Sequence, residues 1–157
     1  MLLGNALVSS KLDYCNSLFY DLTDNFIKLF RHVQHSLATA VFPSSKRSDH
    51  ITPILDKIHW LPVNKRIEFK LATITYKVLQ NRQPSYLSDL LQSYNPPRSL
   101  RSSDKLFLVI LKIKTALARR SVSFAAPSSW NSLPYELRNT KSLPSFTSQL
   151  KTYLFPS

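Results

Sequence analysis

Glycine is almost absent from this sequence of 157 residues, which contains only Gly4 beside ten prolines. Phosphate-cradling loops and dinucleotide-binding turns need several glycines, because only a residue without a Cβ lets the backbone approach a phosphate closely. The sequence therefore excludes both kinds of nucleotide site. Proline, and not glycine, is expected to mark the ends of the helices.

Cysteine and long apolar runs are also scarce. The single cysteine, Cys15, excludes an internal disulfide and a cysteine-type zinc site, and its place in the apolar run 12–19 predicts a buried thiol. No apolar run approaches the ~20 residues of a membrane span. The opening residues MLLGNALVSS lack the basic start of a secretory signal. We therefore expect an intracellular protein of the nucleus or cytoplasm that is neither secreted nor bound to a membrane.

The residues that would carry chemistry are dispersed. The nine acidic residues form no adjacent pair, whereas two-metal phosphoryl transfer needs clustered carboxylates. His32 and His35 have a spacing that metal sites use, but no third ligand lies nearby, which favours a solvated helix face. Ser128 and Ser129 have no recognisable histidine and aspartate setting. The sequence thus predicts no catalytic residue, metal, cofactor or small-molecule substrate.

Negative charge is in short supply as well. Lysine and arginine number 21 against nine acidic residues, which gives a net charge of +12 and a pI near 10.0. Such a field attracts polyanions, nucleic acid first and anionic membrane second; a merely soluble basic surface is the alternative. The hydrophobic fraction of 43% is sufficient for a packed core in one domain or two very small ones.

Apolar residues recur at helical spacing through most of the chain. In the helix expected from Thr23 or Asp24 to Phe42, the apolar positions form one stripe: Ile27, Phe30, Val33, Leu37, Ala40 and Val41. Helices are expected at 2–20, 24–42, 51–58, 62–81, 85–92, 116–126 and 143–155. The β-branched run 106–114 predicts one short strand or hairpin, and 127–134 a turn around Trp130. The expected fold class is mainly α, a small helical bundle.

Basic clusters interleaved with aromatic rings are the candidate functional residues. Lysine and arginine neutralise phosphates, and exposed rings can stack on unpaired bases. Trp60 and Trp130, flanked by leucine and proline, are interpreted as core anchors instead. The candidate nucleic-acid-binding residues are Lys46, Arg47, Lys65, Arg66, Lys70, Arg98, Arg101, Lys105, Arg119 and Arg120. The expected partner is RNA, DNA or an RNA–DNA hybrid.

Several phrases of the sequence are similar to a known family. They are LVSSKLDYCNSLFYDL, RHVQHSLATAVF, HITPILDKIHWLPVNKRIEFKLATITYKVL, PSYLSDLLQ, PRSLRSSDKLFLV, FAAPSSWNSLP and SFTSQLKTYLF. In this order, and over nearly the whole chain, they resemble the C-terminal region of non-LTR (LINE-type) retrotransposon polyproteins of the chicken-repeat and jockey-like clades. The combination of IHWLPV, RIEFK and WNSLP carries the resemblance more than any single phrase.

The resemblance implies a fragment of an RNA-directed DNA polymerase. Residues 1–43 would be a thumb-like helical hairpin, truncated at its start, which in a reverse transcriptase grips the template–primer duplex. Residues 44–95 would be a helical C-terminal extension, 96–105 a basic Pro/Ser linker, and 106–157 a strand and terminal helices. The metal-binding aspartates of the parent enzyme belong to its palm, upstream of this region, so no catalytic residue is carried over.

Three hypotheses follow. The first is a non-catalytic fragment that binds nucleic acid without sequence specificity through its basic helices and linker. The second is an interaction or scaffold module whose apolar faces dock onto the polymerase palm. The third is a decayed relic with no selected function. An enzyme is the hypothesis that the sequence supports least.

Overall fold

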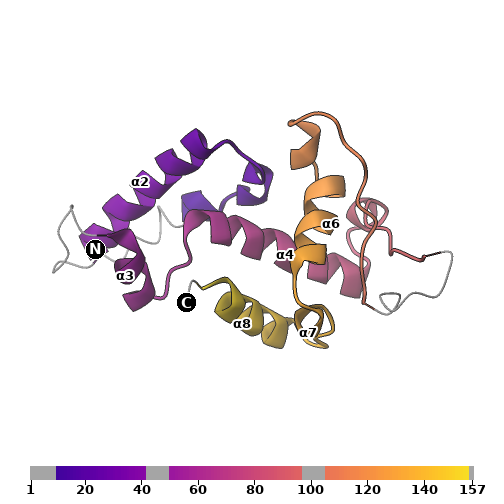
Figure 1. Ribbon diagram of the computed structural model, residues 1–157. Helices are drawn as coiled ribbons and strands as arrows, with labels where there is room; N and C mark the ends of the chain where they lie inside the picture. Colours follow the sequence, from indigo (N-terminus) through magenta and orange to yellow (C-terminus); the bar gives the residue numbers. More distant parts are fainter. Residues whose placement is uncertain (1–9, 42–49, 97–104, 156–157) are drawn as a thin grey trace.

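The computed structural model describes residues 10–41, 50–96 and 105–155, and these ranges confirm the predicted mainly α fold (Figure 1). The helices are α2 (Asp24–Val41), α3 (Ile51–Lys57), α4 (Val63–Asn81), α5 (Ser85–Ser88), α6 (Val122–Ser132), α7 (Tyr135–Arg138) and α8 (Leu143–Leu154), with short 3-10 helices η1 (Asn16–Phe19) and η2 (Ala118–Arg120). The predictions for α2, α3, α4 and α8 are confirmed, and the predicted ends agree with the observed ones to within about two residues. Different definitions of a helix end differ by as much.

Helix α4 is the central element of the fold. It packs against α2, α5, α6, α8 and η1, and Figure 1 shows α6 crossing it while α8 lies along its side. Pro62 precedes its first turn, and Arg82 ends it in the left-handed conformation, donating its N–H to the carbonyl of Val78. The predicted apolar stripe explains this placement, because Ile67, Leu71 and Val78 are all buried.

The main core lies where α4, α6 and α8 meet. Three aromatic side chains form its centre: the rings of Tyr76 and Phe146 are stacked 4.3 Å apart, and Trp130 lies 6.0 Å from Phe146. Trp130 is therefore the core anchor that the sequence predicted, and its indole N–H donates to the carbonyl of Leu106 at 2.9 Å. The core draws on both predicted segments, 44–95 and 106–157, although the predicted domain division itself stays a prediction.

Helix α2 joins the fold through a buried glutamine as well as through part of its apolar stripe. Gln34 is fully buried; its side chain donates to the carbonyl of Leu61 at 2.8 Å and accepts from the N–H of Val63 at 3.1 Å. Ala38 packs with Ile54 and Leu55 in a second, small cluster. The stripe predicted on α2 is partly buried: Ile27, Phe30, Leu37 and Val41 are half-buried, whereas Val33 is 39% exposed.

The first predicted helix is interrupted. Helical residues end at 13, and Cys15 takes a left-handed conformation with φ of 50° before η1 begins. Cys15 is exposed, so the prediction of a buried thiol is wrong. Of the apolar residues around it, Tyr14 and Leu18 are largely exposed, whereas the ring of Phe19 stacks on that of Phe30 with centroids 5.0 Å apart.

The predicted strand over 106–114 is wrong. Within the described ranges this segment makes one isolated antiparallel bridge, between Ser93 and Leu108. The backbone of Leu108 instead bonds to the side-chain amide of Asn131, which accepts its N–H at 2.9 Å and donates to its carbonyl at 2.8 Å. A strand needs a neighbouring strand to satisfy its backbone, and here a helix side chain takes that place.

The region around Pro127 also differs from the prediction. The expected turn at 127–134 is mostly helix, because α6 continues through Pro127 to Ser132, and α7 was not anticipated. Pro127 is fully buried in the core, so its packing outweighs the lost backbone hydrogen bond. The predicted helix 116–126 is represented by η2 and the start of α6, and the predicted helix 85–92 is shortened to α5.

Among the helices of the described part of the chain, none combines the length and apolarity that crossing a bilayer requires.

Candidate nucleic-acid interface

The structure places six of the ten predicted nucleic-acid-binding residues. Lys65, Arg66 and Lys70 lie on the first turns of α4, Arg119 and Arg120 on η2, and Lys105 is exposed at the start of the described segment 105–155. The other four lie outside the described residues: Lys46, Arg47, Arg98 and Arg101.

A basic cavity of about 390 Å³ lies beside the first half of α4. Arg66 and Lys70 of α4 and Lys151 of α8 line it, with Asp13 as its carboxylate. Three cations against one carboxylate leave the cavity positively charged, which favours a phosphate. We call this hollow the Arg66 cavity.

Aromatic surface lies next to these cations. The half-buried rings of Trp60 and Phe69 line the Arg66 cavity together with His59, whose backbone φ is 52°. Rings beside phosphate-binding cations are the arrangement with which proteins hold unpaired nucleotides. Trp60 packs against the small cluster of α2 and α3, in line with its interpretation as a core anchor, and it also lines this cavity.

Two polar atoms of the Arg66 cavity have no hydrogen-bond partner. Arg66 donates through Nη2 to Asp13 at 2.7 Å, which fixes the guanidinium, while its Nη1 is buried without a partner. Asn16 is only 3% exposed, and its Oδ1 is likewise unpaired.

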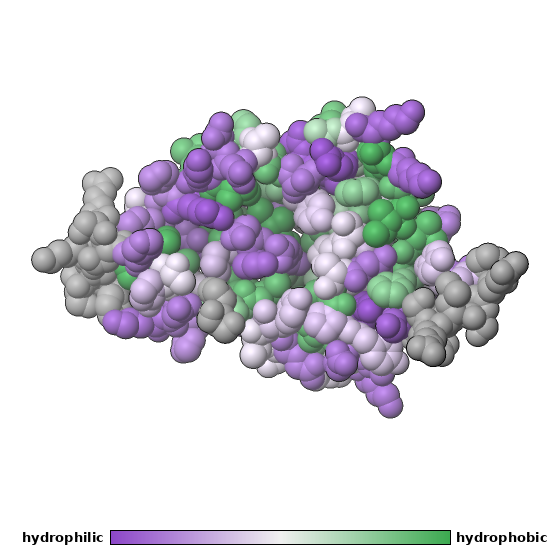
Figure 2. Space-filling model, in the orientation of Figure 1, coloured by the Kyte–Doolittle hydropathy of each residue, from purple (hydrophilic) through white to green (hydrophobic). Residues whose placement is uncertain are grey.

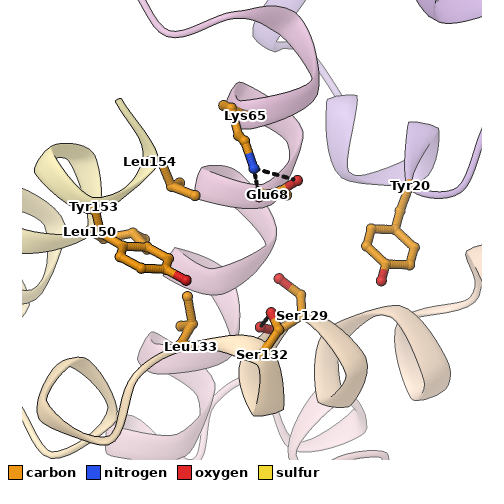
Figure 3. A pocket seen from close by; sticks show the side chains of 9 residues that line it. All are labelled: Tyr20, Lys65, Glu68, Ser129, Ser132, Leu133, Leu150, Tyr153 and Leu154. Carbon is orange, nitrogen blue, oxygen red and sulfur yellow. Dashed lines mark hydrogen bonds and ion pairs between the residues drawn. The ribbon is translucent and has the colours of Figure 1, made fainter. Parts of the chain in front are cut away.

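Lys65 faces a different cavity, of about 450 Å³, shown in Figure 3. Its ammonium is 3.0 Å from the carboxylate of Glu68, so much of its charge is neutralised locally. Ser129 and Ser132 lie across the cavity, but the hydroxyl of Ser132 donates to the backbone carbonyl of Ser129 at 2.8 Å. A serine nucleophile needs a side-chain base as the acceptor of its hydroxyl proton. The hydroxyl of Ser132 donates to a backbone carbonyl instead.

Of the two cations of η2, one forms an ion pair, as Lys65 does, and the other forms none with the residues that the structure describes. Arg119 pairs with Asp21 at 3.2 Å, whereas Arg120 has no carboxylate within 4 Å among the residues that the structure describes. Exposed pairs of this kind weaken the field of each cation. Of the six predicted residues that the structure describes, only Arg66 and Lys70 therefore line the same hollow.

A second basic hollow, of about 200 Å³, lies between α2 and α3. Lys28, Arg31, His32 and His35 of α2 line it with Ile51. His32 is exposed, as expected of a solvated face, but His35 is half-buried and its Nε2 is buried without a partner. Within the ranges described above, no three histidine, cysteine or acidic side chains gather closely enough to hold a metal ion.

Sequence reasoning missed Lys151, Asn16 and Asp13 as parts of the Arg66 cavity. Lys151 is an isolated lysine on α8, and only tertiary packing brings it to α4. No local pattern marks such residues, since the cavity joins segments that are distant in the sequence. The helical spacing of Arg66 and Lys70 on α4 was the signal that could be read.

Comparison with known proteins supplies no relative. No protein-family model, no curated protein and no solved structure matches this chain.

Proposed function

We propose that this chain is a non-catalytic, nucleic-acid-binding segment of a non-LTR retrotransposon reverse transcriptase, corresponding to the end of its thumb and its C-terminal extension. The resemblance of its phrases supplies the family. The observation that carries the binding role is the Arg66 cavity, in which Arg66, Lys70 and Lys151 surround a hollow walled by Trp60 and Phe69.

The binding mechanism is phosphate neutralisation without base readout. Arg66 is held in place by Asp13, while Lys70 and Lys151 are exposed on two different helices. Such a set contacts successive phosphates of a bent or unpaired strand, with the rings available for one base. Hydrophilic side chains cover much of the face over α2 and the start of α4 (Figure 2), which suits a charged partner.

Titration of the purified chain against single-stranded RNA and an RNA–DNA duplex of equal length tests this proposal. We expect salt-sensitive binding to both, and loss of most affinity in an Arg66→Gln, Lys70→Gln double variant. Lys141→Gln is a control, because Lys141 is exposed between α7 and α8. Equal affinities for the double variant and the wild type would contradict the proposed site.

A docking role is the second candidate, and exposed apolar side chains favour it. Phe26, Leu29 and Val33 of α2 are 57%, 61% and 39% exposed. Figure 2 also shows a hydrophobic area beside α6. In the segment 105–117, Leu111 and Leu117 are 50% and 73% exposed. Exposed apolar patches of this kind are typical of interaction sites.

Co-expression with a polymerase palm distinguishes the two roles. If docking is the function, the palm improves the solubility of this chain without changing its affinity for template, and Leu29→Glu abolishes the effect. If nucleic-acid binding is the function, the isolated chain binds template and Leu29→Glu leaves that affinity unchanged. A chain that does neither corresponds to the relic hypothesis.

A further inference from the structure

Arg138, at the end of α7, is a buried arginine that forms no ion pair with any residue the structure describes. Arg138 is only 6% exposed, and its Nε and Nη1 are buried without hydrogen-bond partners. No carboxylate of the described residues lies within 4 Å of its guanidinium. Burial lowers the pKa of this guanidinium, and the nearby charges of Glu136 and Tyr135 act in the opposite direction.

The guanidinium lies over one aromatic ring. The carbon Cζ of Arg138 is 4.1 Å from the centroid of the Phe107 ring. A ring can stabilise the flat face of a guanidinium, but it accepts none of the in-plane N–H groups. The hydrogen-bonding edge of Arg138 therefore needs another partner.

Arg138 lines a cavity of about 290 Å³ between the end of α4 and the segment around Leu108. A second cation, Arg82, lines the same cavity, as do Gln80 and Tyr94. None of the described residues that line it is acidic. Among the residues that the structure describes, two guanidinium groups without a carboxylate form an environment that attracts an anion.

The chemistry of the two arginines selects the anion. A guanidinium presents its N–H groups in a rigid fork that matches two oxygens of a phosphate or carboxylate. A group with two negative charges neutralises two arginines, whereas a carboxylate neutralises one. A phosphate monoester therefore fits this cavity better than a carboxylate.

We propose that the cavity lined by Arg138 and Arg82 is a binding site for a phosphate monoester group, which pairs with these two guanidinium groups. The group comes either from a free phosphorylated molecule or from the terminal phosphate of a nucleic-acid strand. The site is separate from the Arg66 cavity, with which it shares no lining residue, so it does not rest on the proposed nucleic-acid binding.

Calorimetric titration of the full chain with inorganic phosphate tests the site. We expect saturable binding that weakens at least about tenfold in Arg138→Met, which keeps the apolar stem and removes the charge. Arg82→Gln, at the exposed end of α4, is expected to weaken binding less. Lys141→Gln is the matched loss of one charge elsewhere and is expected to leave it unchanged.

The stability of Arg138→Met separates a binding role from a structural one. If Arg138 serves a ligand, the phosphate-free variant is as stable toward urea as the wild type or more stable, because a buried unpaired charge is removed. Added phosphate then stabilises only the wild type. If Arg138 is structural, through its contact with Phe107, the variant loses stability without phosphate and both proteins respond to phosphate alike, which overturns the proposal.

The pH dependence and the source of the phosphate complete the test. Affinity should rise as pH increases through about 6, where a phosphate monoester gains its second charge. A 5′-phosphorylated oligonucleotide that binds more tightly than its hydroxyl-ended counterpart, in an Arg138-dependent manner, identifies the strand end as the source. Binding of inorganic phosphate without that difference identifies a free phosphorylated molecule. Absence of saturable binding to both phosphate probes overturns the proposal, whatever the affinity for polynucleotides.

Discussion

Arg66 of α4 and Asp13 form an ion pair 2.7 Å long that joins two segments distant in the sequence and fixes one guanidinium at the rim of a basic cavity. The arginine is 18% exposed and the aspartate 43% exposed, so the pair is only partly shielded from water. The pair has two effects on a bound phosphate: it orients Arg66, and it places a negative charge beside it.

Removing the carboxylate should therefore strengthen nucleic-acid binding. In Asp13→Asn the amide oxygen can still accept from Arg66, while the repulsion of phosphate is gone. We expect affinity for single-stranded RNA to rise about two- to fivefold, which corresponds to the worth of a partly exposed ion pair. The measurement is an anisotropy titration at fixed salt. Weaker binding in this variant would show that the orientation of Arg66 matters more than the local charge.

The bond network of Gln34 should be essential for stability. Gln34→Met keeps the volume and removes both hydrogen bonds, leaving the carbonyl of Leu61 and the N–H of Val63 buried without partners. We expect the free energy of unfolding to fall by about 2–4 kcal/mol in urea denaturation. Gln80→Met, at an exposed position of α4, is the control. Equal midpoints for both variants would contradict the account of how α2 is attached.

The side chain of Asn131 should hold the segment that resembled a strand. Asn131→Ala removes both bonds to Leu108 and is expected to cost about 1–3 kcal/mol, with faster hydrogen exchange at the amide of Leu108. Asn139→Ala is the comparison, because Asn139 is exposed after α7. Unchanged exchange at Leu108 in Asn131→Ala would mean that the bridge to Ser93 suffices.

Much of the fold could be predicted because α2, α4 and α8 carry apolar residues at helical spacing, and Pro62 and Asp24 lie at or next to their starts. The failures have a common cause in tertiary contacts. The run 106–114 has the composition of a strand but finds Asn131 and not a second strand, and Pro127 is tolerated inside α6 because it packs in the core. The local sequence pattern indicates neither the bonds of Asn131 nor the packing of Pro127.

The candidate site was less accessible to sequence reasoning. Arg66 and Lys70 share a helix face and could be recognised together, but Lys151 reaches them only through the packing of α8 on α4. Lys65 and Arg119 also belong to the predicted set, but their ion pairs with Glu68 and Asp21 reduce their availability. Charge counts predict attraction; they do not predict which cations are free.

The exposed thiol of Cys15 offers a simple check of the region before α2. We expect Ellman's reagent to modify one thiol per chain in the folded protein at a rate close to that in urea, because Cys15 is exposed in a left-handed turn. A rate that increases many-fold only on unfolding would indicate a buried thiol and contradict this description of the turn.

The salt dependence of binding tests the central claim most directly. If about six phosphates are contacted, the logarithm of the binding constant should fall against the logarithm of salt concentration with a slope near −5. Lys70→Gln and Lys151→Gln should each reduce the slope by about 1, and Lys141→Gln should leave it unchanged. A flat salt dependence, or no binding at about 50 mM salt, would contradict the claim that this chain binds nucleic acid through the Arg66 cavity.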